Sequence, residues 1–265
     1  HIIMHATCGC EERIIEGIHD VYPASVDVFG ATAGYDRFLP DGYVFLNGTF
    51  LENGVIFTLI YNDRVWCRIA PGGYLPTQKC GTVTSASGRV IERIDGRPAA
   101  GVYNEWTDGM FDYYVRRGGE LPRSAALYPL ARTFGDDDAL LWLAHPALID
   151  AERQTVELFS EIPTDSHVIQ TRASTESLVE HAGEIFNNLI RPVPREEIRA
   201  GLIMYCAGCA SIVAENMGEV CERLKQTMGD IPFIGFSSYG EQGRLPNLTN
   251  DAHGNMMNVA VLIRK

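Results

Sequence analysis

Two segments in the second half of the chain combine glycine with reactive side chains. Cys206-Ala207-Gly208-Cys209 lies between an apolar run and a run with helical spacing, so Cys206 is expected at a helix N-terminus, where the dipole favours thiolate. Gly235 and then Tyr239-Gly240-Glu241 end the next apolar run. Glycine permits positive φ and lets backbone N–H groups approach a ligand, while a glutamate can bind a ligand ammonium group. These segments predict a site for a small polar ligand.

The beginning of the chain has the same arrangement. One apolar run ends at Cys8-Gly9-Cys10, and the next leads into the loop from Gly30 to Gly34. Apolar residues recur at spacings of three and four after each cysteine segment, which predicts an amphipathic helix. Asp36 follows the first glycine loop as a further acid that could bind an ammonium group. Both halves therefore share the plan strand, loop, helix, strand, glycine loop and strand.

This plan predicts an α/β fold of two related halves with mixed sheets and a pseudo-two-fold internal repeat. Loops that follow parallel neighbouring strands emerge at one edge of a sheet, and ligands bind there when the strand order reverses. We therefore expect a ligand cleft between the halves. Tyr239, Gly240 and Glu241 are expected on one side of the ligand, with the Cys206 loop and Asn255 on another.

The cysteines and histidines leave other chemistries open. The pseudo-symmetry could gather Cys8, Cys10, Cys206 and Cys209 into a zinc or iron–sulfur site, although cysteine is also a common buried residue. A nucleophilic enzyme would use Cys206 with His253 or His5 as its base, but no third orienting residue stands at a recognisable spacing. Non-covalent haem would need one axial imidazole. The candidates for that role are His5, His145, His167 and His253.

The middle of the chain has a different character. Residues 82–94 alternate as two strands, and 98–106 form a short helix whose Tyr103 and Trp106 either stack on a ligand or fill the core. Residues 121–134 are expected to form a loop, and strands at 139–144 and 155–159 are expected to pair. Ser174 starts a helix that Pro192 ends.

Composition narrows the classes of partner. The 34 acidic and 22 basic residues give a net charge of −12, which disfavours nucleic acid and anionic membranes. No apolar stretch reaches the roughly twenty residues that a membrane-spanning helix needs. Seven cysteines, an odd number in a chain of this length, indicate free thiols in the cytoplasm. Because the chain opens on His1 in an apolar run, we expect residues to precede it.

Several short motifs, taken in order, resemble the FIST domain, a bacterial sensory module with an N-terminal and a C-terminal part. The first is Val28 to Gly34, which is similar to the strand and glycine turn of the N-terminal part. The resemblance places that part at residues 1–75 and the C-terminal part at residues 76–265. The motifs similar to the C-terminal part are Gly88-Arg89-Val90, Ile94 to Ala99, Val102-Tyr103, Trp106, Tyr128-Pro129-Leu130, Tyr205 to Gly208, and Gly235 to Glu241.

The resemblance implies a sensor that binds a small ligand, with amino acids or their derivatives proposed, and that passes the signal to a kinase, cyclase or chemotaxis output. Some members resemble haem-dependent nitric-oxide sensors. This implies a binding protein with no catalytic residue and no required cofactor, and it allows a homodimer. The sequence departs from the family at Cys209, where Arg is usual, and at His253-Gly254-Asn255-Met256-Met257, which replaces a His-Asn-x-Thr segment.

Overall fold

A computed structural model of the protein describes residues 1–265 except 36–41, 62, 135–136 and 247. The chain forms two units. The first comprises residues 1–73, 175–253 and 257–265, and the second comprises residues 74–174 and 254–256. Both contain helices and strands, so the expected mixed α/β class is confirmed.

The first unit contains two sheets and a small hairpin. One sheet has the order β19-β18-β2-β1-β5 and the other has the order β17-β16-β20-β6, while β3 pairs with β4. The strands are β1 (Ile2–Ala6), β2 (Val28–Thr32), β3 (Val44–Leu46), β4 (Thr49–Leu51), β5 (Val55–Leu59), β6 (Val65–Pro71), β16 (Ile198–Cys206), β17 (Phe233–Ser238), β18 (Gly240–Gly243), β19 (Ala252–Gly254) and β20 (Met257–Arg264).

The two sheets share a local strand order. β1 is parallel to β2 and antiparallel to β5, and β16 is likewise parallel to β17 and antiparallel to β20. In each case a helical segment joins the two parallel strands, as such crossovers require. Since β1 and β2 are parallel, the residues that precede them lie at one edge of the sheet and the residues that follow them lie at the other.

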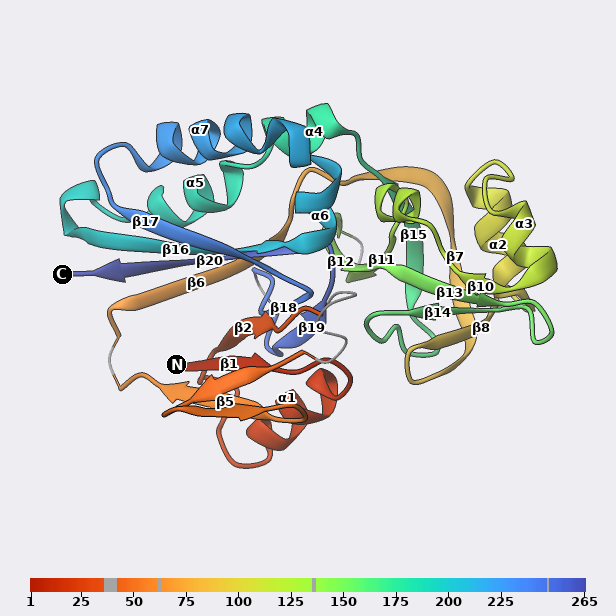
Figure 1. Ribbon diagram of the computed structural model, residues 1–265, viewed down its shortest axis with the longest axis horizontal. Helices are drawn as coiled ribbons and strands as arrows, with labels where there is room; N and C mark the ends of the chain where they lie inside the picture. Colours follow the sequence, from red (N-terminus) through yellow and green to blue (C-terminus); the bar gives the residue numbers. More distant parts are fainter. Residues whose placement is uncertain (36–41, 62, 135–136, 247) are drawn as a thin grey trace. The chain divides into compact units, whose positions relative to one another are not determined.

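Helices cover the outer faces of these sheets (Figure 1). On one side, α1 packs Ile15 and Ile18 against Met4 of β1 and Val28 of β2, since its apolar residues repeat with helical spacing. On the other side, α5 packs on β20 and β6, and α7 packs on α4 and α5. These helices are α1 (Glu11–His19), α4 (Thr175–Glu180), α5 (Glu184–Ile190), α6 (Ala207–Ile212) and α7 (Met217–Met228).

The second unit is built on one nine-stranded sheet in the order β10-β13-β14-β8-β7-β15-β11-β12, with β9 beside β8. Asp95 and Gly96, both at positive φ, form the two-residue turn from β8 to β9. Its elements are β7 (Leu75–Ser87), β8 (Val90–Ile94), β9 (Arg97–Pro98), α2 (Ala99–Trp106), α3 (Asp112–Arg117), β10 (Gly119–Glu120), β11 (Leu130–Phe134), β12 (Asp137–Ala144), β13 (Pro146–Asp150), β14 (Thr155–Leu158) and β15 (His167–Arg172).

Three local predictions are wrong. Residues 130–134 form strand β11 rather than loop, and β12 pairs with this strand instead of with β14. The prolines at 122 and 129 made the whole segment look irregular, although the strand begins directly after Pro129. The helix expected from Ser174 to Pro192 is divided into α4 and α5. At the division a Cβ on Gly183 would lie 2.5 Å from the Thr227 hydroxyl, because α7 approaches closely there.

Candidate functional site

The two glycine segments lie side by side in the first unit. Strand β18 pairs with β2 in antiparallel sense, so that Gly240 lies opposite Thr32 and Gln242 lies opposite Gly30. The backbone N–H of Tyr239 also donates to the Thr32 carbonyl oxygen at 3.1 Å. Segments about two hundred residues apart in sequence thus form neighbouring inner strands of one sheet, where their side chains can act together.

These glycines are required by close packing. A Cβ at Gly30 would lie 1.9 Å from the Met4 carbonyl oxygen, and one at Gly240 would lie 2.2 Å from Cε1 of His253. None of the four glycines expected to line the ligand has positive φ, so that part of the sequence argument is wrong. Protein atoms fill the space beside the other two as well, with Gly34 against Tyr239 and Gly235 against Ile203.

A buried polar network lies beside this pair of strands. The Thr32 hydroxyl donates to Oε1 of Glu11 at 3.0 Å, and the Gly9 N–H donates to the other carboxylate oxygen at 2.8 Å. The side-chain amide of Gln242 donates both to Thr32 Oγ1 and to Nδ1 of His253, each at 2.9 Å. If Nδ1 accepts, the neutral imidazole carries its proton on Nε2, which lies 3.9 Å from Oε1 of Glu11.

Sequence reasoning missed three members of this network. Glu11 looks like a solvated acid in the first turn of a helix, yet it is 1% exposed. Thr32 and Gln242 lie inside segments chosen for their glycines, and both are buried. An acid directly after Cys10 was the available signal, but only the pairing of β2 with β18 shows what it faces.

Glu241 is fully buried next to this network. The Ser238 hydroxyl donates to one carboxyl oxygen at 2.7 Å, and the Met257 N–H donates to the other at 3.3 Å. Burial, with the nearby Cys206 thiol as the second cause, raises the pKa of Glu241 well above its ordinary value. Burial thus favours the protonated form of Glu241, whereas the sequence suggests a carboxylate that pairs with a ligand ammonium group.

Cys206 ends β16 directly before α6, and Gly208 lies in the first turn of that helix. The N–H of Cys206 donates to Oδ1 of Asn258 at 3.1 Å. The adjacent Cys209 thiol, together with burial, raises the pKa of Cys206 well above its ordinary value. The expectation that the helix dipole yields a thiolate here is therefore wrong, and a protonated, buried thiol is a poor nucleophile.

The four-cysteine metal site is also wrong for the part of the chain that the structure describes. Cys206 and Cys209 are buried whereas Cys8 and Cys10 are exposed, and these thiols do not come within ligand distance of one another as a group. None of the seven cysteines forms a disulfide bond in the structure.

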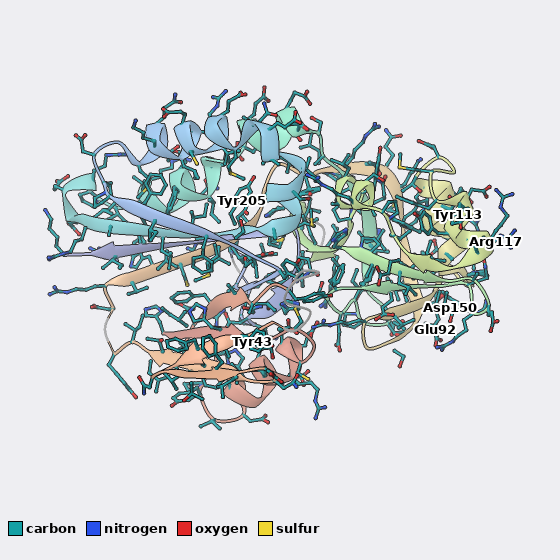
Figure 2. The ribbon with its side chains drawn as sticks, viewed as in Figure 1. Tyr43, Glu92, Tyr113, Arg117, Asp150 and Tyr205 are labelled. Atoms are coloured by element: carbon teal, nitrogen blue, oxygen red, sulfur yellow. The ribbon has the colours of Figure 1, made fainter. Side chains whose placement is uncertain are left out.

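A groove of about 470 Å³ opens beside the polar network. Residues of β1, β2, β3, β5 and β17 line it together with Tyr43 directly before β3, so strands of both sheets and of the small hairpin contribute. Thr32 belongs to the groove and to the network at once. His5 faces Phe236 with ring centroids 6.4 Å apart, and burial lowers the pKa of His5 so that the imidazole is neutral. Tyr43, at the entry to β3, is marked in Figure 2.

The remaining candidates belong to the second unit or lie outside the described residues. Tyr103 is completely buried and stacks on Phe111 with ring centroids 5.3 Å apart. This favours the alternative that Tyr103 fills the core rather than contacts a ligand. Asn255 is buried in the second unit, where its N–H donates to the Leu143 carbonyl oxygen. Asp36 is outside the described residues. Of the haem candidates, His145 and His167 are also in the second unit, and His167 contacts the Thr133 hydroxyl at 2.9 Å.

Within the described part of the chain, no helix is long and apolar enough to cross a membrane. No curated protein matches the chain. Family models do match it over nearly its whole length. The FIST N domain matches residues 1–97 and the FIST C domain matches residues 99–244, as the motifs in the sequence indicate. The chain therefore belongs to the FIST family of sensory domains found in signal-transduction proteins.

Proposed function

We propose that this chain senses an amino acid or a similar small polar metabolite, which binds in the groove of the first unit. The main support for this proposal is the 470 Å³ groove. Thr32 in its wall forms hydrogen bonds within the buried network that also contains Glu11, Gln242 and His253. This volume falls within the range of about 300–1,000 Å³ that is typical of small-molecule sites. The chain acts by binding rather than turnover.

The lining residues define the kind of ligand that fits. Hydroxyl groups of Thr58 and Ser237 and the neutral imidazole of His5 offer uncharged donors and acceptors, while Phe45 and Phe236 offer aromatic surface. Among the residues that the structure describes, none that lines the groove is a lysine, arginine, aspartate or glutamate. We infer that the ligand is a zwitterion or a neutral molecule with an apolar side chain, because a net charge would lack a partner among these described residues.

Signal transfer requires that the ligand bind two arrangements of the protein with different affinity. We propose that the segments β2-β1-β5 and β17-β16-β20 are an internal repeat, supported by their identical strand order and sense. A ligand in the groove contacts both segments, since His5 and Ser237 belong to different ones. Its binding can therefore shift one segment against the other and change how the chain engages a kinase, cyclase or chemotaxis partner.

Haem is the second candidate ligand, and His5 is the observation that favours it. This histidine is neutral and partly buried, and it opens onto a groove with Phe45 and Phe236, as an axial ligand requires. Bound haem iron would supply the affinity for a gas. A haem absorption band in the purified protein, lost in His5→Ala, would select this candidate over the metabolite.

The test of the metabolite proposal is thermal stabilisation by pools of amino acids and related metabolites, followed by calorimetry with the active compound. Tyr43→Ala should weaken binding by about tenfold or more, because truncation removes a large part of the groove wall. Tyr61→Ala is the matched control, since Tyr61 is exposed and does not line the groove. Equal affinity of both variants would exclude the groove, and consumption of the ligand would show an enzyme instead.

A further inference from the structure

A second group of reactive side chains lies in the first unit, at the opposite end of β1 and β2 from the groove. His1 precedes β1 and Asp27 precedes β2. The parallel register places Ile2 opposite Val28, and the Ile2 N–H donates to the Asp27 carbonyl oxygen at 2.9 Å. This pairing fixes His1 and Asp27 side by side. Cys67, on β6 of the other sheet, completes the group.

The three side chains present one ligand atom each to a common point. The imidazole Nδ1 of His1, one carboxylate oxygen of Asp27 and the Sγ of Cys67 all lie within 4.8 Å of one another. Nδ1 lies 3.2 Å from Oδ2 of Asp27, but it is buried and makes no hydrogen bond within the described chain. A buried nitrogen that lacks a hydrogen bond and faces a carboxylate and a thiol is the arrangement that a metal ion would satisfy.

The surroundings support the same assignment. The guanidinium of Arg244 lies 3.2 Å from the other oxygen of Asp27, which fixes the carboxylate and leaves Oδ2 directed at His1. A groove of about 300 Å³ is lined by His1, Asp27 and Cys67 together with Asp63, so an ion and its water can enter. The second acid, Asp63, increases the attraction for a cation.

We propose that His1, Asp27 and Cys67 bind a zinc ion, with water as the fourth ligand. One nitrogen, one oxygen and one sulfur ligand suit Zn²⁺, whereas Mg²⁺ and Ca²⁺ prefer oxygen ligands alone. Tetrahedral coordination at about 2.0–2.3 Å needs only a small approach of the three side chains. On binding, the S–H bond of Cys67 breaks, a zinc–sulfur bond forms, and the thiol proton passes to solvent.

The thiol holds that proton in the absence of the ion. Burial, with Asp27 and Asp251 as further causes, raises the pKa of Cys67 to about 12. A zinc ion that binds Cys67 displaces this proton.

The test uses the reduced full chain after chelator treatment. Titration with Zn²⁺ against a chromophoric chelator should show one tight equivalent per chain, and Co²⁺ should give a thiolate-to-cobalt charge-transfer band. Cys67→Ser should abolish the band and weaken zinc binding at least about tenfold. Asp27→Asn should weaken zinc binding by a similar factor. Cys221→Ser is the matched control, because Cys221 is an exposed thiol of the same unit.

Two results would overturn the assignment. One is that the protein binds no Zn²⁺ in competition with the chelator. The other is a cobalt band that persists in Cys67→Ser and disappears when Cys8 and Cys10, the exposed pair, are replaced by serine. Circular dichroism of each variant shows whether it is folded, and Asp27→Asn tests the site independently of the thiol.

Discussion

The cores of the two units differ in what they bury. In the first unit Glu11, Gln242, Glu241 and His253 are at most 3% exposed, and all of them take part in polar contacts. The second unit has no buried carboxylate among its described residues, and Tyr103 stacks on Phe111 inside an apolar core. Buried ionisable groups cost stability, so they concentrate where a protein needs their chemistry. The comparison supports our proposal that the ligand binds in the first unit.

The largest expected effect tests the packing role of the second unit. Phe111→Ala removes a completely buried ring that contacts Tyr103, Tyr114 and Tyr128. We expect the free energy of unfolding to fall by about 3–5 kcal/mol, since the cavity cannot collapse fully. Urea denaturation measures the change. Tyr113→Ala, at a residue that is 64% exposed, should stay within about 0.5 kcal/mol of the wild type.

Gly30→Ala should destabilise the first unit by about 1–3 kcal/mol, because the new methyl group overlaps the Met4 carbonyl oxygen. The neighbour is backbone, which cannot rotate away. If thermal unfolding of this variant matches that of the wild type, the close approach of β1 and β2 is not what fixes glycine at this position.

The two units should differ in how their stability depends on pH. The pKa of Glu241 is higher in the folded than in the unfolded state. The contribution of this residue to the free energy of unfolding is therefore complete below about pH 4.3 and is lost as the pH rises through the folded-state pKa. Glu241→Gln keeps an oxygen that can accept from Ser238 and cannot ionise. It should remove a slope of up to about 1.4 kcal/mol per pH unit from urea unfolding curves measured above pH 5.

In the second unit, His145 should make stability change with pH in the opposite direction. Burial lowers its pKa to about 4, so its contribution is present above pH 6.5 and is lost as the pH falls toward 4. His145→Gln should therefore reduce acid sensitivity without changing stability in alkali. If both variants altered the same side of the pH profile, the assignment of these buried groups would be wrong.

The smallest expected effect is a gain in stability. Gly17 lies in α1, and a Cβ there would meet no heavy atom within 4 Å. Gly17→Ala should raise the free energy of unfolding by about 0.5–1 kcal/mol, since alanine loses less backbone entropy in a helix. A loss of stability would show that this face of α1 is covered in solution.

Periodicity predicted those parts of the molecule that depend on near neighbours in sequence. The helix at Ala99–Trp106 and the two strands within residues 82–94 follow from apolar spacing and turn chemistry, which act over a few residues. The division of α4 from α5 could not be predicted, because it depends on the approach of α7 to Gly183.

The site shows the same limit. The sequence indicated the glycine segments and Glu241, but it could not show that Gln242 reaches Thr32, which is 210 residues away. Nor could it show that the pKa of Glu241 is raised, since burial is a property of the whole fold. The residue types were readable in the sequence, whereas their protonation states were not.

His5 lies four residues after His1 along the extended chain of β1, so at about 3.3 Å per residue the two are separated by about 13 Å. At physiological ionic strength, fields between exposed charges decay over about 8 Å. An ion added beside His1 would therefore have little direct electrostatic influence on the groove beside His5. The free energies of the two binding events should then be additive, and a measured departure from additivity would report movement of β1 and β2 as a rigid pair.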